Sequence, residues 1–417
     1  RKGCEEMFVW YEKENMRFPV KIWLEKQEDL EDSCREQAYH LAQLPFLHQW
    51  ACLMPDTHAG KGMPIGGVIA ADGVIIPNAV GVDIGCGMAY TETNIRLDDI
   101  REVMTGNGTL IQAMIGDIMR NIPVGFEHHK TVMPCYTLDQ AMEEMDKYEP
   151  DGELLGQIDA GYFQIGTLGG GNHFIELQVD EKGYLAVMIH SGSRHFGKSV
   201  CDYFHFKARE LNRRWYSAVP DEYRLAFLPV DSSEGKQYLH WMKLSLDFAR
   251  ENREKMMLVV KAVLEKWIGK YTELNLEFFH DINCHHNYAA EEEHYGKTVW
   301  VHRKGAVRAE NGELAVIPGA MGSYSYVVMG KGNPESFCSS SHGAGRCYSR
   351  KGAMDAFTCE QVIRDLAAQG VVLGKKKKAD VAEESRFAYK DIEQVMNNQT
   401  DLVAPVKRLK TVGVVKG

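Results

Sequence analysis

The stretch KQYLHWMKLSLDFARENREKMMLVVKAVLEKWI, residues 236–268, carries a long amphipathic pattern. Its apolar residues recur at the spacing that places them on one face of a helix, and they include Leu239, Met242, Leu246, Phe248, Ala249, Met256 and Val260. Clusters rich in glycine and histidine stand on both sides of this predicted helix, which argues against dividing the chain into independent halves. We therefore predict a single large α+β domain over residues 1–417, with a site assembled from distant segments.

Short apolar runs bounded by turn residues predict strands on both sides of that helix. They cover residues 66–70, 73–77, 184–189, 298–301, 314–317 and 324–329. Apolar residues at helical spacing predict two further helices, over residues 101–122 and 358–368. Mixed sheets covered by helices follow from this order of patterns.

The composition is that of an ordinary globular chain, with 44% hydrophobic and 25% charged residues among 417. The formal net charge of -10 gives no general attraction for nucleic acid, so a polyanionic substrate needs a local basic groove or bound cations. The 10 cysteines include no CxxC pair, and their scattered spacing indicates a reducing compartment. No apolar run has membrane-spanning length, so we expect no membrane association, a cytoplasmic location and, by default, a monomer.

Two glycine-rich clusters carry side chains that bind metals. Asp83 and Cys86 lie three residues apart in a glycine-lined loop, where a carboxylate and a thiolate can reach one borderline ion such as Mn²⁺ or Zn²⁺. Asn172 and His173 follow three glycines in the second cluster. Taken alone, each cluster is equally compatible with a turn beside a packed side chain.

Two more clusters contain histidines. His190 begins the segment HSGSR at the end of an apolar strand. His285 and His286 are adjacent and point in different directions, so at most one of them is expected to bind a metal. Four such clusters are hard to explain by packing, and together they supply ligands for two metals if Cys86 bridges them.

The segment SSSHGAGR, residues 339–346, contains a histidine between hydroxyl groups and glycines, followed by an arginine. Glycines allow the backbone to approach a ligand closely, and arginine supplies planar donors to phosphate oxygens. The chain lacks the GxxxxGK[ST], HExxH and KxDG motifs. If a nucleotide is attacked covalently, His342 is therefore the candidate nucleophile, because a neutral imidazole forms a phosphoramidate near pH 7.

Read together, these segments resemble the RtcB family of GTP- and Mn²⁺-dependent RNA ligases. The matching stretches, in the order of the family, are MPDTHAGKG (54–62), VGVDIGCGM (80–88), GGGNHFIE (169–176), HSGSR (190–194), NCHHN (283–287), RKGA (303–306), PGAMGSYS (318–325), SHGAGR (341–346) and VKG (415–417). They run nearly from end to end of the chain. The resemblance implies a single α+β domain around a central metal-containing cleft.

The resemblance also implies roles for individual residues. The implied ligands of two Mn²⁺ ions are Asp83, Cys86, His173, His190 and His286, with Cys86 shared and His286 preferred to His285 because asparagine follows it. His342 is the implied site of guanylylation by GTP. The implied guanosine contacts are Asn172, His173, Phe174, Ile175, Glu176, His286, Asn287, Pro318, Gly319, Ala320, Met321, Ser325, His342, Gly343, Ala344, Gly345 and Lys416. Arg194, Arg346 and Arg350 are the implied contacts to RNA or nucleotide phosphates.

The implied reaction joins an RNA 3′-phosphate or 2′,3′-cyclic phosphate end to a 5′-hydroxyl end through a guanylyl-histidine. The residues after two of the arginines, His195-Phe196 and Cys347-Tyr348, depart from the commonest family pattern and bear on substrate geometry. They motivate a second hypothesis, guanylyl capping or healing of a 3′ end without joining. A dinuclear metallophosphoesterase ranks below, since it leaves the SHGAGR and PGAMG segments without a role. A non-catalytic nucleic-acid-binding module ranks last, because the acidic net charge supplies little unspecific affinity. The chain is compact, which favours a bacterial type of RNA repair enzyme.

Overall fold

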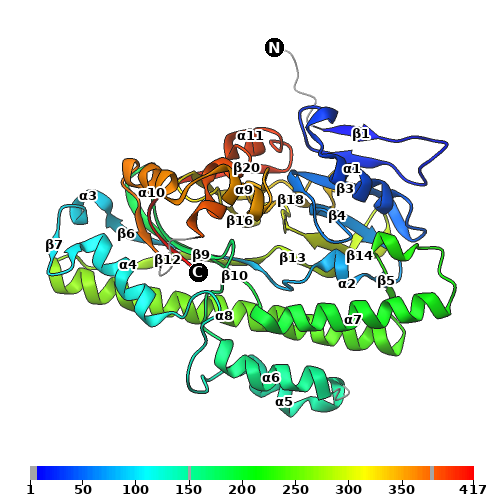
Figure 1. Cartoon of the computed structure of the whole chain (residues 1–417), viewed down its shortest axis with the longest axis horizontal. Helices are drawn as coiled ribbons and strands as arrows, with labels where there is room; N and C mark the ends of the chain where they lie inside the picture. The colour runs from blue at the N-terminus through cyan, green and yellow to red at the C-terminus, as the bar shows by residue number, and fades with distance from the viewer. Residues whose placement is uncertain (1–6, 149–151, 376–379) are drawn as a thin grey trace.

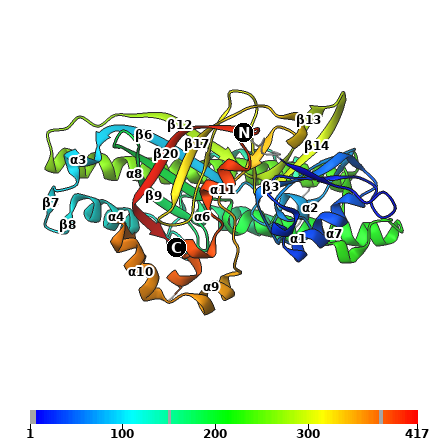
Figure 2. The ribbon, with the colours of Figure 1, turned by 90° about the horizontal axis from the view of Figure 1, so that it is seen from above.

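Two β-sheets lie side by side in the computed structural model, which describes residues 7–148, 152–375 and 380–417 (Figures 1 and 2). The smaller has the spatial order β1 (Phe8–Trp10), β2 (Val20–Ile22), β3 (Leu47–His58), β4 (Ile65–Ala71), β14 (Lys297–Lys304) and β13 (Asn287–His294). The larger has the order β12 (Phe278–His285), β6 (Gly87–Arg96), β10 (Tyr184–Ser191), β9 (Phe174–Asp180), β20 (Val403–Lys416), β17 (Tyr324–Gly330) and β16 (Leu314–Ile317), with β19 (Val372–Gly374) beside β20. The predicted α+β class is confirmed.

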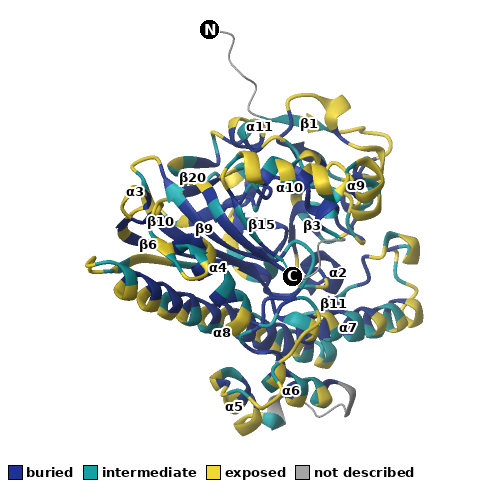
Figure 3. Cartoon of the chain, turned by 60° about the vertical axis from the view of Figure 1, so that its left-hand side comes forward, coloured by how far each residue is buried: buried dark blue, intermediate teal, exposed yellow. Residues whose placement is uncertain are grey.

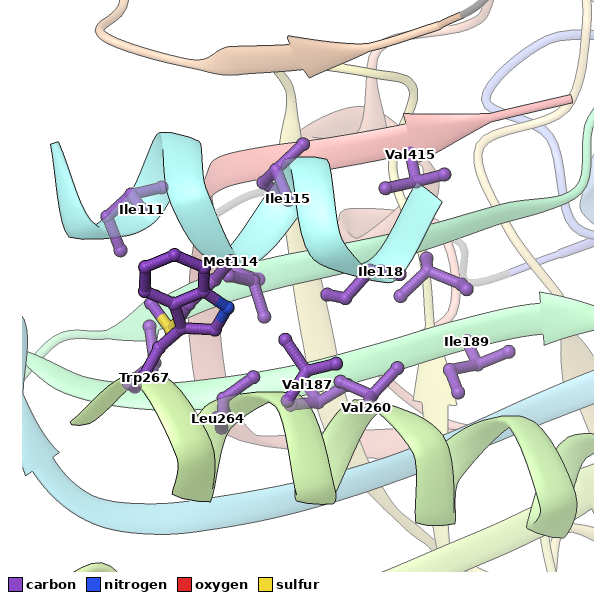
Figure 4. Packing of buried hydrophobic residues seen from close by; sticks show 14 of the residues in the cluster. Ile111, Met114, Ile115, Ile118, Val187, Ile189, Val260, Leu264, Trp267 and Val415 are labelled. Carbon is purple, nitrogen blue, oxygen red and sulfur yellow. The ribbon is translucent and has the colours of Figure 1, made fainter. Parts of the chain in front are cut away.

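Helices cover both faces of the larger sheet. On one face Val187 and Ile189 pack against α4 (Leu110–Asn121) and α8 (Ser233–Tyr271), as Figure 4 shows. On the other face Ala186 and Met188 pack with Leu366 of α10 (Cys359–Ala368). Because successive strand residues point to opposite faces, β10 contributes to both apolar layers.

The long amphipathic stretch is confirmed as α8, a helix of 39 residues. Ser232 caps its N-terminus, because the Ser232 hydroxyl accepts a hydrogen bond from the Gly235 amide at 3.0 Å. Its buried side faces the sheet and its outer side is exposed (Figure 3). The helix α7 (Arg194–Arg214) packs beside it, with the rings of Phe196 and Phe248 stacked 5.5 Å apart.

The helix predicted over residues 101–122 begins later than expected. Residues 104–109 form a small hairpin of β7 (Met104–Thr105) and β8 (Gly108–Thr109), because Gly108 adopts a φ of +98° that ends any helix there. Thr109 and Gln112 then form a capping box that starts α4. The predicted helix over 358–368 is confirmed as α10, with Thr358 as its cap.

Helix α7 is absent from the sequence-based prediction. Glycines 192 and 197 flank its start and weaken the helical pattern there. Because Gly197 has no side chain, α7 can lie close to Ile84. A Cβ atom at position 197 would be only 3.2 Å from the Cβ atom of Ile84. Local propensity is overridden here by close packing.

The remaining elements are short or lie at the periphery. They are α1 (Asp32–Ala42), α2 (Pro77–Val80), α3 (Leu97–Ile100), α5 (Tyr136–Glu143), α6 (Gly152–Gln164), α9 (Arg350–Ala356), α11 (Ile392–Asn397), β5 (Val74–Ile75), β11 (Leu228–Pro229), β15 (Ala306–Arg308) and β18 (Ser339–Ser341). Within the described ranges, no helix has the length and apolar character to cross a bilayer.

At one junction, a single residue of the chain connects an edge strand of each sheet. Strand β12 is an edge of the larger sheet and β13 an edge of the smaller, and only His286 separates them along the chain. An apolar cluster that includes Val68 and Val301 of the smaller sheet with Tyr326 and Val328 of the larger spans the same junction. The junction is therefore a packed interface rather than a hinge.

The packing of α8 predicts where substitutions destabilise the fold. Leu264→Ala removes a fully buried side chain of the sheet-facing cluster, so we expect the free energy of unfolding to fall by about 2–5 kcal/mol. Leu258→Ala, on the same helix but 67% exposed, is the matched control and should change it by less than about 0.5 kcal/mol. Urea unfolding followed by circular dichroism measures both, and equal losses would contradict this packing.

Candidate active site

Strand register brings four of the predicted metal ligands to one end of the larger sheet. His190 lies opposite Phe174 of β9 and opposite Met88 of β6, while His285 of β12 lies opposite Gly87. Cys86 precedes β6, His173 precedes β9 and His286 follows β12. Four neighbouring strands, β12-β6-β10-β9, therefore deliver their terminal side chains to a common point.

The five predicted ligands form two groups that share Cys86. In one group Nε2 of His173 lies 3.1 Å from Oδ2 of Asp83 and 3.4 Å from Sγ of Cys86. In the other Nε2 of His190 lies 3.3 Å from Sγ of Cys86 and 3.3 Å from Nε2 of His286. The structure thus brings all five side chains together with their ligand atoms facing inwards.

Backbone carbonyls orient two of these imidazoles. His173 Nδ1 donates to the carbonyl of Leu168 at 3.1 Å, and His190 Nδ1 donates to the carbonyl of Asn172 at 3.1 Å. This arrangement leaves each Nε2 with a free lone pair directed into the group. Burial lowers the pKa values of His190 and His286 well below the ordinary value, so both rings are neutral and able to bind a metal at neutral pH.

The donor set fits borderline divalent ions. Thiolate, imidazole and carboxylate together suit Mn²⁺ or Zn²⁺. Asp83 Oδ1 is a buried oxygen without a hydrogen-bond partner among the described residues, and Gly192 packs against this carboxylate where a side chain would collide with it. Burial raises the pKa of the Cys86 thiol well above its ordinary value, so a thiolate at this position requires a neighbouring cation.

The adjacent histidines point in different directions, as expected. His286 faces His190, whereas Nδ1 of His285 lies 3.1 Å from a guanidinium nitrogen of Arg253 and 3.0 Å from the carbonyl of Gly85. His285 therefore lies behind the ligand group rather than in it.

His342 lies next to these groups and is held by a buried carboxylate. Its Nδ1 is 2.6 Å from Oδ2 of Asp56, a fully buried residue of β3 that also accepts the backbone amides of His342 and Gly343 at 3.1 and 3.2 Å. The His342 and His286 ring centroids are 4.6 Å apart. With a hydrogen on Nδ1, the lone pair of Nε2 is free for nucleophilic attack.

Two cavities open on His342. The larger, of about 620 Å³, is lined by Asp83, Cys86, His173 and His286 together with Lys304 and Arg350. The smaller, of about 60 Å³, is lined by Phe174, Glu176, residues 318–321, residues 343–345, Glu384 and Lys416. His342, Asn172 and Tyr389 line both, so the imidazole of His342 lies between two adjoining spaces.

Most of the residues assigned to guanosine line the smaller cavity, but five do not. Two of these, His173 and His286, line the larger cavity instead, and the other three have different roles. The side chain of Ile175 points to the opposite face of the sheet and packs in the core against α8, because it alternates with Phe174 and Glu176 along β9. Ser325 accepts the Gly319 amide at 3.1 Å and so shapes the loop of residues 318–321. Asn287 holds the Asp83 carbonyl and the Gly305 amide, at 3.0 and 2.8 Å.

The three arginines assigned to phosphates differ in their availability. Four of the five donors of Arg346 bind Glu384, the hydroxyl of Tyr389 and two backbone carbonyls. Arg350 is exposed and lines the larger cavity, with its guanidinium over Gly171. Arg194 lies over Gly169 and donates to Thr167 and to the carbonyl of Gly125. Arg350 is thus the arginine best placed to meet a ligand.

Some residues of the site had no role in the sequence analysis. Asp56 lies within the MPDTHAGKG stretch, so a motif marked its position but not its partner. Lys304 donates to the carbonyls of Lys61, Met63 and Asn78, and burial lowers its pKa to about 8. Glu384 binds the ammonium of Lys416 at 2.7 Å, and no local motif surrounds this glutamate.

Fold and site define a class of enzyme in which a cluster suited to a divalent metal lies beside a histidine held by a buried carboxylate. The chain belongs to the RtcB family: the model described as "tRNA-splicing ligase RtcB" matches residues 37–417. The family predicted from the sequence is confirmed.

Relatives match over nearly their whole length. The RNA-splicing ligase RtcB of Escherichia coli strain K12 is 36% identical, with 96% of this chain and 97% of the relative covered. The tRNA-splicing ligases RtcB of Pyrobaculum aerophilum and Thermococcus kodakarensis are each 32% identical, with 96% of this chain and 95% of each relative covered. The alignment spans 419 positions with the bacterial relative and 473 and 469 with the archaeal ones, which agrees with the predicted compactness.

The ligand geometry predicts metal binding through sulfur. Addition of Co²⁺ should produce a thiolate-to-metal absorption band, and Cys86→Ser should abolish that band because the shared sulfur is lost. Cys201→Ser is the matched control, since Cys201 is a buried thiol bonded to the Pro77 carbonyl away from the site. A band that survives in Cys86→Ser would place the metal elsewhere.

Proposed function

We propose that this protein is an RNA ligase that joins 3′-phosphate or 2′,3′-cyclic phosphate ends to 5′-hydroxyl ends with GTP and two Mn²⁺. The observation that carries the proposal is the His342 imidazole, fixed by Asp56 and placed between two cavities beside a two-group ligand set. The family membership and the names of its relatives support RNA as the substrate. Residues 1–417 act as one catalytic domain in this proposal, because the shared apolar cluster joins both sheets.

In the first step the neutral His342 Nε2 attacks the α-phosphorus of GTP. A phosphorus–nitrogen bond forms, the bond to the β-phosphate oxygen breaks, and pyrophosphate leaves. The Asp56 carboxylate accepts a hydrogen bond from Nδ1–H and stabilises the positive charge that develops on the ring. The residues that line the smaller cavity would contact the guanosine, with the Glu176 carboxylate available to the donors of the base.

Asp83, Cys86 and His173 would hold one Mn²⁺, and Cys86, His190 and His286 the other. When bound, such ions neutralise charge on phosphoryl oxygens during in-line displacement. They supply the positive charge that a chain of net charge -10 lacks overall.

In the second step an oxygen of the RNA 3′-phosphate attacks the phosphorus of the guanylyl group and releases His342. The 5′-hydroxyl of the other RNA end then attacks the activated 3′-phosphate, a phosphodiester forms, and GMP leaves. The larger cavity, with Arg350 at its wall, is the space for these ends. This activation is needed because an unmodified phosphate monoester has a poor leaving group.

Guanylyl capping of a 3′ end without joining is the second candidate. Its support is the engagement of four of the five donors of Arg346 within the protein, which limits the contacts that this arginine can make to a second RNA end. An assay with both RNA ends present separates the two, since only ligation yields a longer strand. We assign the protein to the cytoplasm, because the nine described cysteines are free, and we treat it as a monomer.

Covalent labelling tests the nucleophile. With radiolabelled GTP and Mn²⁺ the wild type should form an acid-labile adduct, and His342→Ala should form none. Asp56→Asn should slow labelling by roughly 10³-fold, because the imidazole loses its charge partner and correct tautomer. His48→Ala, which removes a histidine bonded to the His294 carbonyl, is the control and should label normally. Wild-type protein that fails to label would overturn the covalent step.

The pH dependence of nucleotide binding tests the smaller cavity. Burial raises the pKa of Glu176 to about 7, so its carboxylate gains a proton and loses an acceptor as the pH falls through 7. We expect GMP affinity to fall up to roughly tenfold per pH unit below that point and to level off above it. Isothermal titration of Glu176→Gln should show weaker binding with a flat pH profile. If GMP affinity fell equally with pH in the wild type and in Glu176→Gln, Glu176 would not contact the base.

A further inference from the structure

Two adjacent residues in the middle of α8, Asn252 and Arg253, are polar and fully buried. They lie in the helix that packs on the Val187 and Ile189 face of the larger sheet. His190 alternates with Ile189 along β10, so the metal-ligand side chains project from the opposite face. Asn252 and Arg253 therefore approach the ends of the ligand strands from behind.

The guanidinium of Arg253 binds three ligand-bearing segments at once. It donates to the carbonyl of Gly85 at 2.8 Å and to the carbonyl of Ser191 at 2.9 Å. It also donates to Oδ1 of Asn283 at 2.8 Å, and its Nη2 lies 3.1 Å from Nδ1 of His285. Gly85 precedes Cys86, Ser191 follows His190, and His285 precedes His286, so three of these four residues are next to a predicted ligand.

The amide of Asn252 binds the fourth segment. Its Oδ1 accepts the amides of Gly166 and Thr167 at 2.7 and 3.1 Å, and its Nδ2 donates to the Thr167 carbonyl at 3.1 Å. The next carbonyl, of Leu168, orients His173. Nδ2 also lies 3.1 Å from the carbonyl of Gly192. Asn252 thereby links the loop before His173 to the end of β10.

The partners of Arg253 are unusual for a buried cation. Its hydrogen bonds within the described residues go to neutral acceptors and to no carboxylate. Burial of a charge without a bonded counter-ion is costly, and an apolar side chain of similar volume would give a more stable core. A guanidinium nevertheless offers a rigid fork of five donors, which fixes the spacing of three strands as no apolar side chain can.

We propose that Asn252 and Arg253 are positioning residues for the two-metal centre, and that they hold Cys86, His173, His190 and His286 at the spacing that binds the ions. This inference rests on the metal centre of the proposed function. Neither residue contacts the ligand atoms, the nucleotide or the RNA. Because Cys86 belongs to both groups, displacement of the Gly85–Cys86 segment weakens both ions together.

Mn²⁺ titration of the full chain, followed by the electron paramagnetic resonance signal of the free ion, tests the proposal. We expect the wild type to bind two Mn²⁺ and Arg253→Met to bind both at least tenfold more weakly, as loss of supporting contacts around metal ligands does. Arg253→Lys keeps the charge but not the fork, so it should not restore affinity. Arg250→Met is the matched control, because Arg250 is an exposed arginine of the same helix, and its affinity should equal that of the wild type.

Each result has a defined meaning. Two-ion binding by the wild type and equal affinity in a folded Arg253→Met variant would overturn the positioning role and leave the proposed function intact. A wild type that binds no Mn²⁺ would overturn the metal centre itself. If circular dichroism shows Arg253→Met to be unfolded, Asn283→Ala decides, since it removes one acceptor of the fork from a partly exposed position. We expect about a threefold or greater loss of affinity there, and unchanged affinity would overturn the proposal.

Discussion

The pairing register of four neighbouring strands is the constraint on which this structure depends. Strands β12, β6, β10 and β9 have an end at the same level, and each carries a predicted metal ligand at or next to that end. A shift of one residue in any pair would turn its side chain to the opposite face of the sheet. The apolar cluster between this sheet and α8 opposes such a shift, because Val187 and Ile189 would leave the core with it. Apolar packing on one face of the sheet thus keeps the predicted ligands in their positions on the other face.

The junction of the two sheets explains why His342 and the predicted metal ligands meet. Asp56 and Lys304 belong to the smaller sheet, and His342 follows β18 beside it. His190 belongs to the larger sheet, His173 directly precedes its strand β9, and His286 is the residue between β12 and β13. A site at such a junction is concave, since each sheet supplies one wall. The buried carboxylate of Asp56 then reaches His342 without a separate binding loop.

The charges in this site come from a few nearby side chains and not from the net charge of the chain. The chain as a whole is acidic, yet the larger cavity is lined by Lys304 and Arg350 and by side chains that bind cations. Burial keeps His190 and His286 neutral, so their nitrogen lone pairs remain available. A polyanionic substrate would therefore meet a few directed charges in this cavity rather than a broad basic surface.

Much of this arrangement was predictable from the order of residues along the chain. Helical spacing marked α8, and glycine-flanked motifs marked Cys86, His173 and His342. These are local signals, because a ligand that approaches the backbone needs glycine and particular donors at short spacing. The preference for His286 over His285 came from the family resemblance. Other features depend on contacts between distant segments. Asp56 becomes the partner of His342 across 286 positions, and Arg253 reaches Gly85 across 168. The delayed start of α4, the close packing of α7 and the turn of Ile175 into the core also follow from three-dimensional packing. The sequence therefore specified which chemical groups the site contains, whereas the folded chain specified which of them touch, because strand register and burial act between residues that no local pattern connects.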